Sequence, residues 1–225
     1  MSARGLLFVA VAAGLAGCGD GSGPPPPQAS SLHVLHAIRG GPSLTVSVDG
    51  ARGSTLVFGG QSRTFLSPGL HELVLVPSDT SHSLIVDFSA QDGVNYTAFA
   101  IDSVAGATHT VEPVIVPDTG SVPAVGHSRL RITSFAAAAP PIDGYRAQPD
   151  STGLLVSAQP LNFRALTRFF DGAPGAWSVV ISHAGMTDTL IATGPIAMAV
   201  GQAQTIVVLD SIPGLVTWRL VPNRN

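Results

Sequence analysis

The second half of the sequence repeats the pattern of the first, and this repeat limits the possible folds more than any other feature. Residues 32–50 align without a gap with residues 130–148, an offset of 98. Later segments match in the same order at offsets up to 108, as loop insertions would produce. The agreements that carry the alignment are Leu32 with Leu130, Pro42 with Pro140, Leu44 with Ile142, Pro68-Gly69 with Pro174-Gly175, Gly93 with Gly201, and residues 116–118 with residues 221–223. We therefore expect two copies of one domain.

Each copy has the pattern of short strands separated by tight turns. Residues 44–48 alternate strictly between apolar and polar side chains, and 25 Gly and 18 Pro interrupt the chain too often for long helices. The best helix candidate, residues 135–139, ends at Pro140-Pro141 and allows at most one turn. Turn signals such as Asp49-Gly50, Asp92-Gly93 and Asp171-Gly172 recur at intervals typical of β-sandwiches.

The predicted fold is all-β, with two tandem immunoglobulin-like β-sandwich domains after a signal peptide and a Pro-rich tether. The first domain is expected over residues 31–120 and the second over residues 128–225, joined by a linker at residues 121–127 within a stretch rich in small residues and proline.

The N-terminal segment has the features of a secretory signal peptide. One Arg precedes residues 5–17, which are all apolar or small, and this run is shorter than the roughly 20 residues that a spanning helix needs. Leu15, Ala16, Gly17 and Cys18 resemble a bacterial lipobox. The resemblance implies cleavage after residue 17 and lipid attachment at Cys18. The alternative is an ordinary signal peptide that happens to end near a cysteine.

Residues 18–30 form a low-complexity segment with four consecutive prolines. Such a segment favours polyproline II and can hold a folded body about 35 Å from a membrane surface. We expect it to act as a tether. Its simpler interpretation is a disordered leader.

Residues 32–50 also resemble the opening of a known family. Leu32-His-Val-Leu-His-Ala37, Pro42 and the strand that ends in Asp49-Gly50 are similar to the start of the domain of unknown function 4397 family. The resemblance implies a secreted bacterial β-domain that often occurs in tandem behind a lipoprotein signal. Arg39-Gly40 and Ser134-Phe135 depart from the family pattern, so a role for the family's histidine cannot apply to both copies.

Composition excludes several classes of function. The chain has 11 basic residues, all of them Arg, against 14 acidic residues, so its net charge of −3 argues against a nucleic-acid-binding surface. One cysteine excludes an intramolecular disulfide framework and a Cys-rich zinc site.

The polar residues suggest structural roles rather than chemistry. His33 and His36 have the spacing of helical metal ligands, but on a strand they face opposite sides, and His36 is expected to pack with Leu32 and Val34. Asp49, Asp92 and Asp171 precede Gly and are expected to stabilise turns. We expect neither a metal nor a cofactor.

The aromatic residues offer one candidate contact surface. Trp177 and Trp218 share strand faces with aliphatic residues, which favours the core over a sugar-stacking platform. Residues 163–170 (FRALTRFF) lack a clear pattern, so an exposed contact surface would be sought there first. The alternative for this segment is a short strand that caps the sandwich.

The sequence thus predicts a non-catalytic bacterial envelope or cell-surface protein, anchored to a membrane by its N-terminal lipid and facing the periplasm or the exterior. Its two modules would serve interaction, adhesion or scaffolding, with an envelope protein or polysaccharide as partner and no nucleic acid. A carbohydrate-binding module is the alternative. A hydrolase that uses loop Asp and His residues is the less favoured one, and it requires those side chains to converge in a concave site.

Overall fold

The computed structural model describes residues 30–80, 82–102, 110–148, 151–155, 159–211 and 215–224. These residues form seventeen strands and no helix, which confirms the all-β class. The helix candidate at residues 135–139 is instead the end of a strand followed by a turn. Within the described ranges, nothing forms an apolar helix of the length needed to cross a membrane.

The first sandwich consists of two four-stranded sheets that enclose an apolar core. In one sheet the order is β4-β1-β7-β8, with β1 parallel to β7, and in the other it is β3-β2-β5-β6. Burial alternates along β2 and β5 because side chains on a strand point alternately to the core and to solvent. The strands are β1 (Ser30–His36), β2 (Leu44–Val48), β3 (Ala51–Leu56), β4 (Gln61–Leu66), β5 (Gly69–Pro77), β6 (Leu84–Ala90), β7 (Tyr96–Asp102) and β8 (Val111–Pro117).

The second sandwich has the same plan. One sheet has the order β12-β9-β16-β17, again with a parallel pair (β9 and β16), and the other has the order β11-β10-β13-β14 with β15 also paired to β13. The strands are β9 (Ser128–Phe135), β10 (Ile142–Gln148), β11 (Ser151–Leu155), β12 (Phe170–Gly172), β13 (Gly175–His183), β14 (Ile191–Ala192), β15 (Ile196–Met198), β16 (Ala203–Asp210) and β17 (Val216–Arg224).

Strand pairing agrees with the repeat seen in the sequence. Leu32 lies opposite Tyr96 in the parallel pair of the first sandwich, and Leu130 lies opposite Gln204 in that of the second. These registers reproduce the offsets of 98 and 108, so β1 corresponds to β9 and β7 to β16. Equivalent positions can therefore be compared residue by residue.

The expected β-sandwich architecture is confirmed, and the strand order adds a refinement. In an immunoglobulin constant domain the first strand lies beside the second, in a sheet of order A-B-E-D. Here β1 lies between β4 and β7, and β2 belongs to the opposite sheet. The immunoglobulin-like description thus holds for the two packed sheets and not for the order of their strands.

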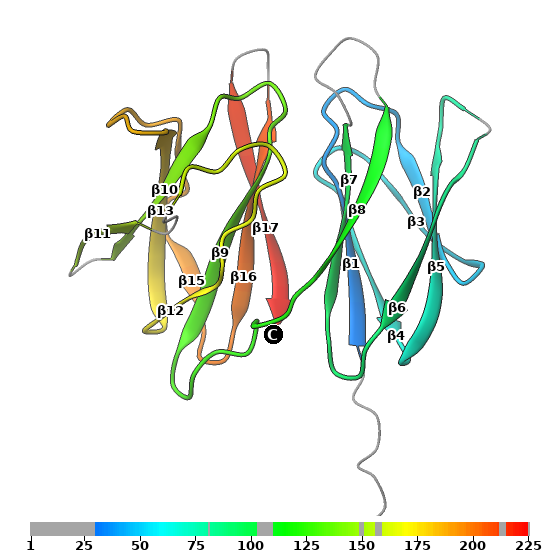
Figure 1. Cartoon of the computed structure of the whole chain (residues 1–225), viewed down its shortest axis with the longest axis horizontal. Helices are drawn as coiled ribbons and strands as arrows, with labels where there is room; N and C mark the ends of the chain where they lie inside the picture. Colours follow the sequence, from blue (N-terminus) through cyan, green and yellow to red (C-terminus); the bar gives the residue numbers. More distant parts are fainter. Residues whose placement is uncertain are drawn as a thin grey trace, which may run out of the picture.

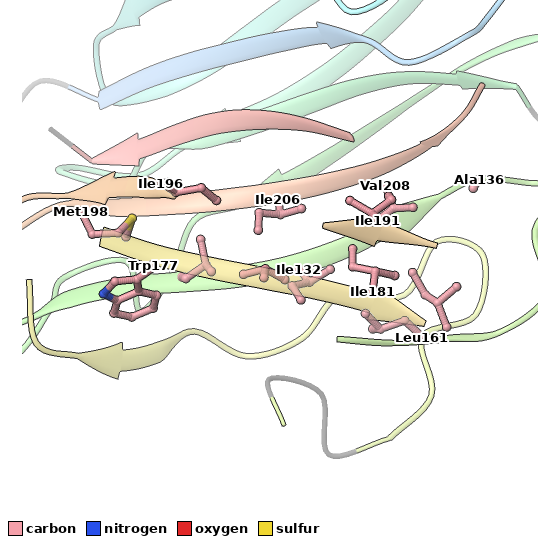
Figure 2. Packing of buried hydrophobic residues seen from close by; sticks show 13 residues of the cluster. Ile132, Ala136, Leu161, Trp177, Ile181, Ile191, Ile196, Met198, Ile206 and Val208 are labelled. Carbon is pink, nitrogen blue, oxygen red and sulfur yellow. The ribbon is translucent and has the colours of Figure 1, made fainter. Parts of the chain in front are cut away.

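The four sheets stack as layers, with the β1–β7 sheet facing the β9–β16 sheet (Figure 1). A third apolar cluster fills the space between these two middle sheets. Strands β1, β7, β9 and β16 are consequently buried on both faces along most of their length. Figure 2 shows the core of the second sandwich, where Trp177 lies at one end and Leu161 at the other.

Two of the three predicted Asp-Gly turns are observed. Asp49 and Gly50 both have positive φ (51° and 74°), as a two-residue hairpin between β2 and β3 requires. Asp92-Gly93 lies in the turn before β7. The prediction for Asp171-Gly172 is wrong, because both residues belong to β12 and pair with β9. The side chain of Asp171 is held there by Arg129.

Candidate functional site at the junction of the two sandwiches

The two sandwiches share an apolar junction core. Phe99 and Phe135 come from opposite sandwiches, and their ring centroids lie 4.5 Å apart. Each large side chain that is fully buried in this way contributes roughly 1.5–3 kcal/mol. The junction core comprises Leu35, Ala37, Phe99, Ile101, Phe135, Val207, Leu209 and Val221, with Phe58, Val114, Val116 and Phe163 packed against it.

Beside this core, five buried polar residues close a ring of hydrogen bonds. Thr97 Oγ1 donates to Asp118 Oδ2 (3.0 Å) and accepts from Asn223 Nδ2 (3.4 Å). Thr205 Oγ1 donates to Asn223 Oδ1 (2.6 Å) and accepts from Arg131 Nε (2.8 Å). Arg131 Nη2 completes the ring at Asp118 Oδ1. The ring joins strands of both sandwiches, so it fixes their relative position.

The ring consists largely of equivalent residues from the two copies. Thr97 corresponds to Thr205, Asp118 to Asn223, and Arg131 to His33. Burial raises the pKa of the Asp118 carboxyl, while the charge of Arg131 opposes this shift. Burial and the nearby charge of Arg63 lower the pKa of His33 to about 4. His33 is therefore neutral at pH 7, and Arg131 carries the charge in the second copy.

A cleft of about 470 Å³ opens next to the ring, between the end of β8 and the segment that leads into β12. Three arginines line it, together with apolar side chains of both sandwiches. Arg131 stacks over the ring of Phe169, with 4.5 Å between Cζ and the ring centroid. The lining residues are Val116, Pro117, Thr119, Gly120, Arg129, Arg131, Leu166, Thr167, Arg168 and Phe169. We call this space the junction cleft.

The three arginines of the junction cleft differ in how their charge is compensated. Arg129 forms two bonds to the carboxylate of Asp171, at 2.5 and 2.6 Å, and the pKa of Asp171 is lowered as a result. Arg131 is paired with the buried carboxylate of Asp118. Arg168 is exposed and stacks over Phe170 at 5.5 Å, but it has no ion-pair partner within the described part of the chain. The cleft thus presents one uncompensated positive charge beside apolar surface.

The candidate contact segment at residues 163–170 lies partly inside the protein. Phe163 packs against the junction core, and Phe170 packs against the core of the second sandwich. Arg164 forms a two-bond ion pair with Glu112 of the first sandwich, at 3.0 and 2.5 Å. The segment therefore joins the two sandwiches, and its last residue begins the capping strand β12. Residues 166–169 of the segment line the junction cleft, and Arg168 is the exposed charged residue among them.

The histidines have structural surroundings. Ring Nδ1 of His36 accepts from Ile38 N (3.2 Å) and ring Nε2 donates to Pro42 O (2.8 Å), so His36 packs in the core of the first sandwich as predicted. His33 points to the opposite face, toward the junction. Among the described residues, no group of three His, Cys, Asp or Glu side chains could hold a metal ion.

Two histidines pair with aspartates at separate places. His71 Nδ1 contacts Asp49 Oδ2 at 2.7 Å, and its Nε2 is occupied by Ser67 O. His183 Nδ1 contacts Asp188 Oδ2 at 2.5 Å beside a cavity of about 40 Å³. The first pair has no free ring nitrogen, and the second faces a space fit for one or two water molecules.

Both tryptophans belong to the second sandwich rather than to an exposed platform. Trp177 is fully buried, and its Nε1 donates to Ala173 O at 2.8 Å. Trp218 is half-buried and packs against the same core. The core assignment is therefore confirmed for both residues. Cys18 and the lipobox residues Leu15, Ala16 and Gly17 lie outside the described residues.

The sequence analysis missed Asp118 and Arg131, although one signal pointed to them. Asp118 lies just before the predicted linker at residues 121–127, yet it is buried and hydrogen-bonded to the side chains of Thr97, Arg131 and Asn223. The repeat places Thr and Asp or Asn at equivalent positions of both copies, on strands that are otherwise apolar. Polar residues at such matched positions indicate a shared buried network.

Comparison with known proteins gives one family. The model of a family described as "Domain of unknown function (DUF4397)" matches residues 30–145, which is half of the chain. The match covers the first sandwich and continues through β9 into β10, so it includes both Asp118 and Arg131. A search of curated proteins finds no match.

Proposed function

The chain belongs to the DUF4397 family, and from this premise we propose that it is a lipid-anchored, non-catalytic protein of the bacterial envelope that holds a partner at the junction cleft. The observation that carries the proposal is the cleft itself, which lies between two sandwiches fixed by a shared core and a buried polar ring. A binding site built on rigid elements keeps its geometry without loop ordering.

The cleft favours a partner that carries acidic groups. Arg168 supplies a positive charge that no described acidic residue pairs with, and Phe169 and Leu166 supply apolar contact. Guanidinium groups bind carboxylates with two parallel hydrogen bonds, which gives direction as well as affinity. An acidic envelope protein or polysaccharide has the required chemistry.

The lipobox resemblance of residues 15–18 supports the proposed lipid anchor. Acylation at Cys18 would fix the protein to a membrane, and the Pro-rich segment up to residue 30 would hold the sandwiches away from its surface. With such an anchor, the cleft would face the periplasm or the exterior of the cell.

The two alternatives have less support. A carbohydrate-binding module needs exposed aromatic platforms, and both tryptophans pack in the second core. A hydrolase needs Asp, His and a nucleophile in one concave site, and the two His–Asp pairs lie in different sandwiches.

Membrane fractionation tests the anchor. Cys18→Ser should move the protein from the membrane fraction to the soluble fraction, and Ser31→Cys in that background should not restore the anchor. If the Cys18→Ser protein stays with the membrane, the anchor proposal is wrong.

Affinity capture of partners from envelope extracts, with the protein as bait, tests whether the junction cleft is the binding site. Arg168→Glu reverses the free charge and should abolish the capture of the partner, while Arg52→Glu, on the exposed strand β3, should leave it unchanged. Equal capture by both variants would refute the cleft as the binding site.

A further inference from the structure

The second sandwich contains a buried cation that has no ion-pair partner among the described residues. Arg146, on β10, is only 6% exposed, and its guanidinium stacks on the ring of Trp177 with 3.9 Å between Cζ and the ring centroid. Its Nε has no hydrogen-bond partner, and its Nη1 makes a long contact of 3.4 Å with Asp171 O. A buried charge is costly unless it is paired, so this arrangement calls for an explanation.

The described carboxylates of the second sandwich bind other groups than Arg146. Those that the structure describes are bonded to Gly185 N (Asp143), to Arg129 (Asp171), to His183 (Asp188) and to Ala137 N (Asp210). Burial lowers the pKa of Arg146, and no acidic group opposes this shift. Among the residues that the structure describes, the guanidinium therefore has no acidic partner.

The first sandwich provides an internal control for this position. Strand pairing shows that Arg146 corresponds to Val48 and Trp177 to His71. His71 has a carboxylate partner, Asp49, whose equivalent in the second copy is Ala147. The second copy has thus gained a cation and lost the acidic residue beside it. The fold alone does not require this change, because the first sandwich forms with an aliphatic side chain at the same place.

Space for the guanidinium is provided by a glycine. Gly172 on β12 corresponds to Leu66 in the first copy, and a Cβ at Gly172 would lie 2.6 Å from the Trp177 ring and overlap Nη1 of Arg146. The missing side chain at Gly172, on the edge strand β12, leaves room for the guanidinium of Arg146 to lie against the Trp177 ring. Figure 2 shows Trp177 at this end of the core, next to β12.

We propose that Arg146, stacked on Trp177 and beside Gly172, is the anchor of a binding site for an oxyanion: a carboxylate, phosphate or sulfate group of a small ligand. The anion would take the hydrogen bonds that Arg146 leaves unused and would supply the missing negative charge. This site faces the interior of the second sandwich, on the other side of β12 from the junction cleft, and it is independent of the lipid anchor.

A fluorescence titration tests the site directly. Trp218→Phe leaves Trp177 as the single tryptophan of the full chain, so its emission reports on the stacked pair. Sodium acetate, phosphate and sulfate are added separately at constant ionic strength, with chloride as the balancing ion. We expect a saturable change with at least one oxyanion, and the order of the three apparent affinities distinguishes a carboxylate from a tetrahedral anion. A linear response to all three, equal to that of chloride, would overturn the proposal.

A matched pair of variants assigns the effect to Arg146. Arg146→Met should weaken binding at least tenfold, while Arg168→Met, which removes an exposed arginine of the same sandwich, should not.

Thermal unfolding gives a second readout, because a ligand that binds only the folded state should raise Tm by about 3 °C at ten times its Kd. Without added oxyanion, Arg146→Met should be at least as stable as the parent protein. A large loss of Tm in that buffer, together with no oxyanion response of the parent, would show a purely structural role for Arg146.

Discussion

The guanidinium of Arg131 and the carboxylate of Asp118 lie between the sandwiches, where their side chains are 5% and 0% exposed. Taking such charges out of water costs several kcal/mol, and the ring of hydrogen bonds offsets that cost only while it is complete. Arg129 and Asp171 form a similar pair nearby, but both side chains reach solvent. The two pairs therefore allow the effect of burial to be measured with the same residue types.

Arg131→Met should lower the free energy of unfolding by about 3–5 kcal/mol, because it leaves a buried carboxylate without its partner. Arg129→Met, the control, should cost less than about 1 kcal/mol, since exposed ion pairs contribute little. Urea unfolding of both variants measures the difference. Similar losses for the two would contradict the structural role assigned to the ring.

Because His33 is buried in its neutral form, the stability of the protein should decrease in acid. His33 has a folded-state pKa of about 4 against an ordinary value of 6.5, so between these values the unfolded chain binds more protons than the folded one. Stability contributed by neutral His33 is therefore present above pH 6.5 and is lost as the pH falls toward 4. His33→Gln should reduce this loss by about 2 kcal/mol, measured by urea unfolding at pH 7 and pH 4.

His71 serves as a control, because its contribution to stability should depend on pH in the opposite direction. The hydrogen bond to Asp49 raises the pKa of His71, so its contribution is full below pH 6.5 and is lost as the pH rises through the folded-state value. His71→Gln should consequently cost more at pH 5 than at pH 8. Parallel pH profiles for the two variants would contradict both assignments.

Strand alternation explains which residue positions could be predicted. The orientation of His36 and Trp177 needs only the two-residue period of a strand, and both predictions agree with the structure. Arg131 and Asp118 were missed because a charged residue on a strand is usually exposed. They are buried only because the second sandwich packs against the first, and no local sequence pattern indicates this packing.

At the scale of elements, the hairpin between β2 and β3 depends on one side chain. Asp49 adopts positive φ, and its carboxylate accepts hydrogen bonds from Glu72 N (2.9 Å) and from His71. Asp49→Ala should therefore destabilise the fold by about 1–3 kcal/mol, through both the strained turn and the lost bonds. Thermal unfolding measures this loss.

Asp49→Asn separates the two contributions. Asparagine tolerates positive φ, so this variant should cost less than Asp49→Ala. The pKa of His71, followed by NMR, should fall toward its ordinary value in both variants because the carboxylate is gone. An unchanged pKa of His71 would show that Asp49 does not control it.

The element that the sequence described least well is β12. Asp-Gly is a common turn pair, and residues 163–170 carry no periodic pattern, so the strand at residues 170–172 could not be separated from a loop. Its assignment depends on pairing with β9 and on the Arg129 contact, both of which join residues 40 or more positions apart. Elements with a strict internal alternation, such as β2, needed no such information.

At the scale of the whole molecule, the junction core joins the two sandwiches through shared buried surface. The sequence predicted two domains joined by a linker at residues 121–127, and the structure adds that the middle sheets bury apolar side chains against each other. Strand pairing agrees with the offsets of the repeat, but the sequence could not show that equivalent faces of the two copies pack together. Apolar residues on both faces of β7 and β16 were the available signal.

A shared core predicts a single unfolding transition. Differential scanning calorimetry should give one peak, with equal calorimetric and van't Hoff enthalpies, because neither sandwich keeps its junction face buried after the other unfolds. The double variant Phe99→Ala/Phe135→Ala removes the ring pair at the centre of the junction and should split the peak into two. As the control, Leu73→Ala/Val179→Ala removes apolar volume from the two separate cores and should lower the temperature of a peak that stays single. Two peaks for the parent protein would show that the sandwiches unfold independently, and the junction would then be a contact between separate domains rather than a core.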